Sequence, residues 1–203
     1  MRLEAFTLTG RHVRLEPLLA AHAAELTAAA DRDRATYGWT AVPEDEPAMT
    51  RYIEALLQDA ERDTVVPFAQ RRLSDGALVG CTRLMSLVWL PGRSLPAEAE
   101  IGGTWLAADA QRSAINSEAK LVLLTHAFEV WDVQRVAVCT DERNERSRTA
   151  IERLGASFEG VLRNHRVNAG HHTSPGPRNT AVYSILPDEW PAIRRRLQER
   201  LGV

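Results

Sequence analysis

The feature that most constrains this chain is the stretch from Glu98 to Trp131, where a strand-like segment leads through a small-residue loop into a long apolar helix. Gly102 and Gly103 interrupt the strand pattern, which marks either a bulge with close backbone approach or a simple kink that lets the sheet curve. The helix is apolar almost all round, which is typical of a helix buried against a sheet. Free N–H groups in its first turn, together with the helix dipole, favour a bound phosphate group.

The loop before this helix lacks both strong phosphate signatures, GxxxxGK[ST] and GxGxxG, which excludes a P-loop and a dinucleotide fingerprint. We expect the loop to cover Ala107–Asn116, with Ser117 and Glu118 in the first helical turn. Within this region the segment Gln111–Ser117 has the length of another kind of phosphate loop.

The second half of the chain supplies a second strand–helix unit. Arg135–Thr140 has the composition of a buried strand, and the helix after it is predicted from its two ends. Asn144 is a good N-cap and Gly155 a good C-terminal stop. A further strand begins at Phe158.

The remaining elements follow from local patterns. Residues 11–16 alternate as a first strand, Pro17 is expected to begin a helix, and a second helix covers about 46–62. Turn residues 74–76 predict a hairpin of strands 65–71 and 77–89. Two late strands, 158–167 and 180–186, and a C-terminal helix, 188–201, complete the predicted order.

Taken in order, the motifs EIG…TW, NSEAKLVLLTHAFE, TDERNERSRTAIERLGA, EGVLRNH and NTAVYSILPDEWP resemble the GNAT superfamily of N-acetyltransferases. They are most similar to the branch of ribosomal-protein N-terminal alanine/serine acetyltransferases, and the similarity runs from LTGRHVRLEPL over nearly the whole chain. The resemblance implies one α/β (α+β) domain over residues 1–203. Its sheet is expected to be mixed, mostly antiparallel and strongly twisted, with about seven strands flanked by helices and splayed at the centre to admit acetyl-CoA.

The resemblance also implies a cofactor site. The family's loop pattern is Gln/Arg-x-x-Gly-x-Gly/Ala. Gln111 matches its first position, whereas Ala114 stands where the pattern has Gly and Asn116 where it has Gly or Ala. The backbone of Leu106 and Ala107 is expected to bond the pantetheine arm like an added strand. N–H groups from the loop should hold the pyrophosphate, with Arg112 adding charge. The implied cofactor-binding residues are Leu106, Ala107, Gln111, Arg112, Ser113, Ala114, Ile115, Asn116, Ser117, Asn144 and Ser147.

The candidate general base is Glu100, which resembles in its spacing from Gln111 the central-strand glutamate that other superfamily members use. Glu98 lies on the same face and is an alternative, and His165 is a third candidate if its strand faces the cleft. A solvated strand end is the structural alternative for Glu100.

The candidate acid is Ser147, three residues after Asn144, as in the ribosomal-protein branch. The tyrosine that many members place seven residues after the asparagine is Ile151 here, so that route is absent. Ser147 could instead stabilise only its own helix, and Asn144 could either bind the pantetheine arm or cap the helix.

Composition and local patterns limit the possible partners, cellular compartment and metal sites. The net charge of −2 does not indicate nucleic acid as the main partner. No signal peptide or membrane-length apolar run is apparent in the sequence, and Cys81 and Cys139 fit buried thiols in a reduced, cytoplasmic protein. His171 and His172 lack a third ligand with sensible spacing, so no metal is expected there and a solvated hairpin tip is favoured.

The resemblance implies that the acceptor is an amine. An α-amino group has a reference pKa of about 7.7–8.0 against about 10.4 for lysine. A protein N-terminus is therefore substantially neutral near neutral pH and needs only a weak base to remove its proton. We expect an acetyl-CoA-dependent acyltransferase acting on a protein N-terminal α-amine, with a homodimer as the expected assembly. Acetylation of a small amine (an antibiotic or a polyamine) and non-catalytic acyl-CoA binding remain alternatives. Tyr37 and Trp39, in an early loop, either wall the acceptor cleft or only pack the loop down.

Overall fold

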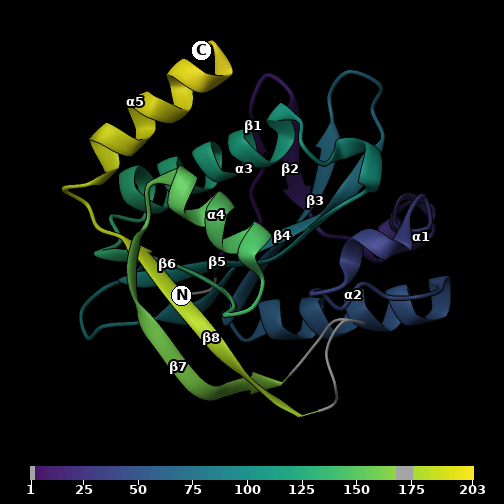
Figure 1. Ribbon diagram of the computed structural model, residues 1–203, viewed down its shortest axis with the longest axis horizontal. Helices are drawn as coiled ribbons and strands as arrows, with labels where there is room; N and C mark the ends of the chain where they lie inside the picture. Colours follow the sequence, from purple (N-terminus) through teal and green to yellow (C-terminus); the bar gives the residue numbers. More distant parts are fainter. Residues whose placement is uncertain (1–2, 168–175) are drawn as a thin grey trace.

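The computed structural model describes residues 3–167 and 176–203. Its strands form one mixed, mostly antiparallel sheet of eight strands (Figure 1). The strand order is β1-β2-β3-β4-β5-β6-β8-β7. The strands are β1 Leu8–Thr9, β2 Val13–Pro17, β3 Val65–Arg72, β4 Leu78–Val88, β5 Glu98–Leu106, β6 Arg135–Asp141, β7 Ser157–Val167 and β8 Pro177–Ile185. The expected α/β class is confirmed, with the two-residue β1 extending the sheet beyond the seven strands anticipated.

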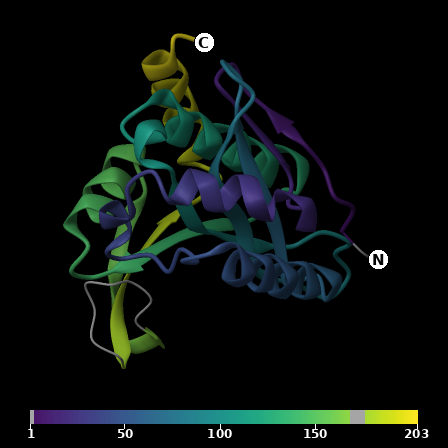
Figure 2. The same cartoon turned by 90° about the vertical axis from the view of Figure 1, so that its right-hand side faces the viewer.

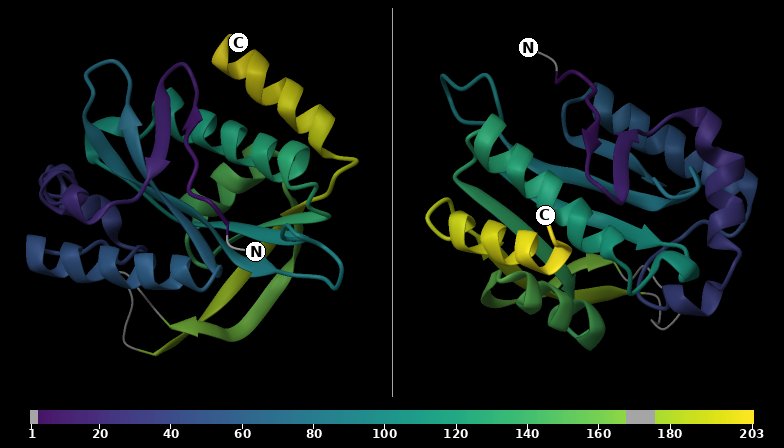
Figure 3. Two further views of the ribbon diagram at one scale, coloured as in Figure 1. Left: turned by 180° about the vertical axis from the view of Figure 1, so that it is seen from behind. Right: turned by 90° about the horizontal axis from the view of Figure 1, so that it is seen from above.

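Helices cover both faces of this sheet (Figures 2 and 3). They are α1 Ala23–Ala30, α2 Glu46–Glu61, α3 Ala114–Thr125, α4 Glu145–Leu154 and α5 Trp190–Leu201. One buried cluster joins α1 and α2 to β3, β4 and Trp105, and a larger one joins α3, α4 and α5 to the opposite face. The two cores therefore hold the central strands firmly from both sides.

The sheet opens at its centre. β5 and β6 are its one parallel pair in the described residues, and they are matched only from Glu98 to Glu100 on β5. Beyond Glu100 the two strands part, while β5 continues to pair with β4 as far as Leu106. The hydrogen-bonding edge of β5 after Glu100 is thus left to face a gap, as expected for a splayed sheet.

A bulge in β5 lies at the same point. The register against β4 shifts between Cys81 and Arg83, so that Gly102 pairs with Arg83 and Trp105 with Cys81. Gly103 has a φ of 56°, and a Cβ there would lie 2.5 Å from the Arg83 guanidinium carbon. The positive φ favours glycine, and the absence of a Cβ lets the Arg83 guanidinium lie against the bulge. The glycine pair therefore marks a bulge with close approach, the first of the two interpretations of the sequence.

Most predicted elements are confirmed, and two boundaries were wrong. Pro17 ends β2, and the first α-helix begins only at Ala23 after a 3-10 turn over Ala20–His22. Helix α3 begins at Ala114, three residues earlier than expected, because the Ser113 hydroxyl accepts the Ile115 N–H and acts as N-cap. Both segments offered more than one residue suited to starting a helix.

Neither a membrane span nor a metal cluster is present in the described part of the chain. No helix there is both long enough and apolar enough to cross a bilayer. Residues 3–167 and 176–203 also contain no group of three His, Cys, Asp or Glu side chains that could hold a metal ion. His171 and His172 lie outside the described residues. Both cysteines are free thiols, Cys81 buried and Cys139 half-buried.

Glu118 ties α3 to the N-terminal hairpin. Its carboxylate accepts the backbone N–H groups of Arg11, His12 and Val13 at 2.7, 2.6 and 2.9 Å, and the residue is only 2% exposed. A Cβ on Gly10 would lie 2.3 Å from this carboxylate carbon, so the turn passes as closely as glycine permits. The contact fixes the helix that carries the candidate site against the edge of the sheet.

We expect Glu118→Gln to lower the free energy of unfolding by about 1–3 kcal/mol, because the amide NH₂ must face at least one of the buried N–H donors. Urea denaturation measures the change, with the exposed Glu61→Gln as matched control. Equal midpoints for the two variants would contradict this role of Glu118.

Candidate active site

A cavity of about 790 Å³ occupies the gap where β5 and β6 part. Its described walls come from β4, β5, the start of α3, β6, α4, the β7–β8 pair and the segment 35–41. The side chains that line it include predicted residues (Glu100, Leu106, Gln111, Arg112, Asn116, Ser117, Asn144 and Ser147). The sequence-predicted site residues therefore converge on one cleft, with the exceptions given below.

The phosphate end of the cleft is the start of α3. Arg112 has a left-handed backbone, with a φ of 59°, and is exposed at the turn into the helix. Asn116 instead lies within the first helical turn, so its replacement of the family's small residue does not require left-handed backbone. Ser113, Ala114 and Ile115 do not line the cavity with their side chains, and Ile115 packs in the core.

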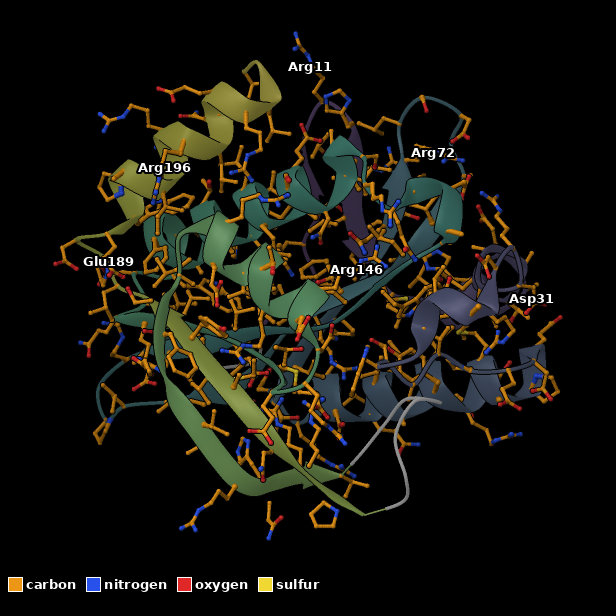
Figure 4. The ribbon with its side chains drawn as sticks, in the orientation of Figure 1. Arg11, Asp31, Arg72, Arg146, Glu189 and Arg196 are labelled. Carbon is orange, nitrogen blue, oxygen red and sulfur yellow. The ribbon has the colours of Figure 1, made fainter. Side chains whose placement is uncertain are left out.

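Gln111 joins the end of β5 to α4 across this end of the cleft. Its amide nitrogen donates to the Leu106 carbonyl at 2.9 Å, and its oxygen accepts from the Arg146 guanidinium at 2.8 Å. Arg146 projects from the first turn of α4 toward this loop (Figure 4). Arg112, Arg146 and Arg200 line the same cavity. These cations and the helix N-terminus suit a polyphosphate.

Leu106 and Ala107 differ in what they offer a ligand. The Ala107 N–H donates to the Val79 carbonyl at 2.7 Å, so it faces β4, and Ala107 does not line the cavity. The expectation for Ala107 was therefore wrong: backbone groups alternate in direction along a strand, so only one of two neighbours faces the gap. Leu106 is that residue, and its carbonyl is the one held by Gln111.

Asn144 and Ser147 lie at the N-terminus of α4 and line the cleft. The Asn144 side-chain oxygen accepts the Ser147 N–H at 3.1 Å, which makes Asn144 the helix N-cap as predicted. The cap uses the oxygen and leaves the amide nitrogen for a ligand. Ile151 also lines the cavity, where a tyrosine would have been needed for the other superfamily route.

Glu100 is buried at the point where the sheet divides, with 4% exposure. Arg166 from β7 clamps both carboxylate oxygens, at 2.9 and 2.6 Å, and the Ser86 hydroxyl donates to one of them at 3.2 Å. Glu98 does not line the cavity and lies 3.8 Å from Arg135. His165 is exposed on β7 and also lies outside the cavity lining. Of the three candidate bases, Glu100 alone faces the cleft.

Lys120 is a site residue that the sequence argument missed. It is the one lysine in the chain, lies one turn after Asn116, and is buried in the cavity wall with 9% exposure. Its ammonium donates to the Thr104 hydroxyl at 3.0 Å, just after the β5 bulge. Burial lowers the pKa of Lys120 to about 8. The Asn116 side-chain oxygen is buried beside it without a hydrogen-bond partner in the described residues, as expected for a position where a bound ligand supplies the donor.

Four aromatic residues of the described chain line the cavity: Tyr37, Trp39, Tyr52 and Trp105. Tyr37 packs edge-on against Trp105 with ring centroids 5.9 Å apart, and the Arg143 guanidinium lies 5.2 Å from the Trp39 ring centroid. Tyr37 and Trp39 both line the cavity, so they do more than pack their loop. Tyr52 from α2 also lines it, and burial raises its pKa to about 12.

Comparison with known proteins shows the family. Residues 12–157 match the acetyltransferase (GNAT) domain family. The chain belongs to the GNAT family. It is therefore an acetyl-CoA-dependent N-acetyltransferase, a class to which the splayed β5 edge and the basic start of α3 are suited. The GNAT chain is also 33% identical over 144 residues to a Bacillus subtilis (strain 168) protein named "Putative ribosomal N-acetyltransferase YdaF", covering 65% of this chain and 72% of that protein.

Solved structures agree on the fold. The GNAT chain has a TM-score of 0.82 and 29% identity to a GCN5-related N-acetyltransferase from Brucella melitensis, over 98% of this chain and 86% of that one. RimJ of Mycobacterium smegmatis, solved in complex with CoA-disulfide, has a TM-score of 0.77 at 20% identity, over 98% of this chain and 94% of that one. At 20% identity the second likeness supports the fold alone.

Proposed function

We propose that this GNAT enzyme acetylates a protein N-terminal α-amine, in the manner of the ribosomal-protein acetyltransferases. The name of the Bacillus subtilis relative supports this acceptor class. The observation that carries the proposal is the charge of the cleft: one carboxylate, Glu100, lines it among the described residues, against seven basic side chains.

This balance disfavours the alternative acceptors. Polyamines and cationic antibiotics need carboxylates near the reacting amine, because a cation entering a basic cleft is repelled. The single carboxylate is already held by Arg166. A peptide presents one amine and otherwise neutral backbone, so it avoids most of this penalty.

Each residue then has a role in direct transfer. The α-amine is substantially neutral near its reference pKa of about 7.7–8.0, and Glu100 accepts its proton directly or through one water. Ser147 donates a proton toward the departing thiolate, whose reference pKa is near 8.5. The first turn of α3, with Arg112 and Arg146, holds the pyrophosphate of acetyl-CoA, and Leu106 bonds the pantetheine arm.

Thiol release from acetyl-CoA tests this proposal. Peptides that begin with Ala or Ser are expected to give turnover, and spermidine and a cationic aminoglycoside are not. We expect Ser147→Ala to lower kcat at least about 100-fold with little change in the KM for acetyl-CoA, because general-acid catalysis contributes about 10²- to 10⁴-fold. Thr149→Ala, an exposed change in the same helix, is the control. Faster turnover of spermidine than of every peptide would overturn the assignment.

We also propose a homodimer. The edge strand β7 exposes four large apolar side chains: Phe158, Val161, Leu162 and Val167. An exposed apolar edge strand favours association with a partner. Light scattering should give about twice the chain mass, and a monomer at micromolar concentration would exclude it.

A further inference from the structure

Besides Glu100 and its partner Arg166, the cleft holds two arginines, Arg83 and Arg178, and neither forms an ion pair within 4 Å with a carboxylate of the described residues. Arg83 on β4 lies against the β5 bulge, where its guanidinium carbon is 2.5 Å from the position of a Cβ on Gly103. Its one hydrogen bond to a side chain in this part of the structure is to the Tyr52 hydroxyl, at 3.4 Å. Arg178 on β8 lines the same cavity, and its Nε is buried without a partner.

Arg166 does not screen these charges. It lies opposite Arg178 in the β7–β8 register, and its guanidinium is committed to Glu100. Burial lowers the pKa of Arg178, and Arg166 lowers it further, against the opposing charges of Asp141 and Glu100. Arginine nevertheless stays protonated in proteins, so the cost of burying its charge is relieved only when an anion arrives.

Arg83 and Arg178 lie away from the end of the cleft that is proposed to hold the phosphates of acetyl-CoA. A strand rises about 3.3 Å per residue, so Gly103 lies about 10 Å back along β5 from Leu106, after which the chain turns toward α3. Arg83 and Arg178 therefore lie near Glu100 and the bulge, whereas Arg112 and Arg146 lie at the start of α3 and α4. The phosphates of acetyl-CoA need the second pair, which leaves the first pair facing the acceptor.

We propose that Arg83 and Arg178 bind a carboxylate that lies close to the reacting amine of the acceptor. This inference rests on the proposed function: for a protein N-terminus, the carboxylate belongs to Asp or Glu in the second to fourth positions. A guanidinium forms two parallel hydrogen bonds with a carboxylate, which gives orientation as well as affinity. The enzyme thereby selects acidic N-terminal segments.

The native enzyme tests the inference with three matched peptides that begin with Ser and continue with two Glu, two Ala or two Lys. We expect kcat/KM to fall in that order, with at least a tenfold difference between the Glu and Lys peptides, mostly in KM. The difference should shrink between 50 mM and 500 mM salt, because screening weakens the attraction. Equal rates, or a preference for Lys, would overturn the inference and leave the N-terminal acetyltransferase assignment intact.

Variants locate the effect. Arg83→Gln and Arg178→Gln should each lower the Glu-to-Ala ratio of kcat/KM severalfold, whereas Arg163→Gln, an exposed control on β7, should leave that ratio unchanged. An unchanged ratio in both cleft variants would exclude this pair as the carboxylate site. Free glutamate is tested as a further acceptor. If glutamate is acetylated and no peptide is, the acceptor is not a protein N-terminus, but the carboxylate-binding role of the two arginines still holds.

Discussion

Glu100→Gln is expected to lower kcat/KM for a neutral Ser-initiated peptide at least 100-fold. The change keeps the shape of the side chain but removes the carboxylate that faces the cleft and holds Arg166 at 2.9 and 2.6 Å. The measurement is the initial rate of thiol release at several peptide concentrations. Glu98→Gln is the matched control, two residues earlier on β5 and outside the cavity lining, and should retain native activity within about twofold.

Arg166 separates the two ways in which Glu100 could act. If Glu100 accepts the proton of the amine, Arg166→Gln keeps the base and should reduce kcat/KM less than tenfold on the neutral peptide. If Glu100 serves only to position Arg166, the two variants should lose activity equally. Near-native activity of Glu100→Gln would remove this residue from the reaction altogether.

Lys120→Met is expected to raise the free energy of unfolding by about 2–3 kcal/mol at pH 7. A pKa of about 8, against an ordinary value of 10.5, means that the native state carries this ammonium at a cost of about 3 kcal/mol. Loss of the hydrogen bond to Thr104 offsets about 1 kcal/mol of the gain. The measurement is urea denaturation of both proteins.

The pH dependence of this difference has a definite sign. Below pH 8 both folded and unfolded chains carry the proton, so the cost is fully present. Between pH 8 and 10.5 the unfolded chain keeps the proton while the folded chain loses it, so the contribution of Lys120 to stability improves as the pH rises. The advantage of Lys120→Met should therefore fall below about 1 kcal/mol by pH 10.

Comparison with the native protein at each pH is essential, because burial raises the pKa of Cys81 to about 12 and that of Cys139 to about 11, which destabilises the fold in the same range. These thiols are present in both proteins and cancel in the difference. Arg51→Met, an exposed cation on α2, is the control and should change little at any pH. A constant advantage of Lys120→Met across the range would contradict a buried ammonium.

The parts of the fold that the sequence predicted are those with local signals. Asn144 and Gly155 bracket α4 because a cap and a left-handed glycine act on their own helix, and Gly155 has a φ of 103° as this requires. Pro17 misled because proline suits a helix start and a strand end equally. The start of α3 was placed late because Ser113 was assigned to the loop, whereas its side chain accepts the Ile115 N–H and caps the helix.

Only those site residues that belong to motifs with a fixed spacing along the sequence could be predicted. Glu100, Gln111 and Ser147 were found because motif spacing is read along a sequence. Arg166 escaped prediction because its distance from Glu100 is set by pairing among distant strands. Lys120 escaped because a lone lysine in an apolar helix is ordinarily assigned to a solvated face. Charged side chains that meet from separate strands and helices leave no recognisable pattern in the sequence.

The most direct test of the central claim is mass-spectrometric location of the acetyl group on one peptide that carries a Ser α-amine and a single internal lysine. We predict one acetyl group, confined to the α-amine, at neutral pH. Acetylation of the lysine with a free α-amine would contradict an N-terminal acetyltransferase.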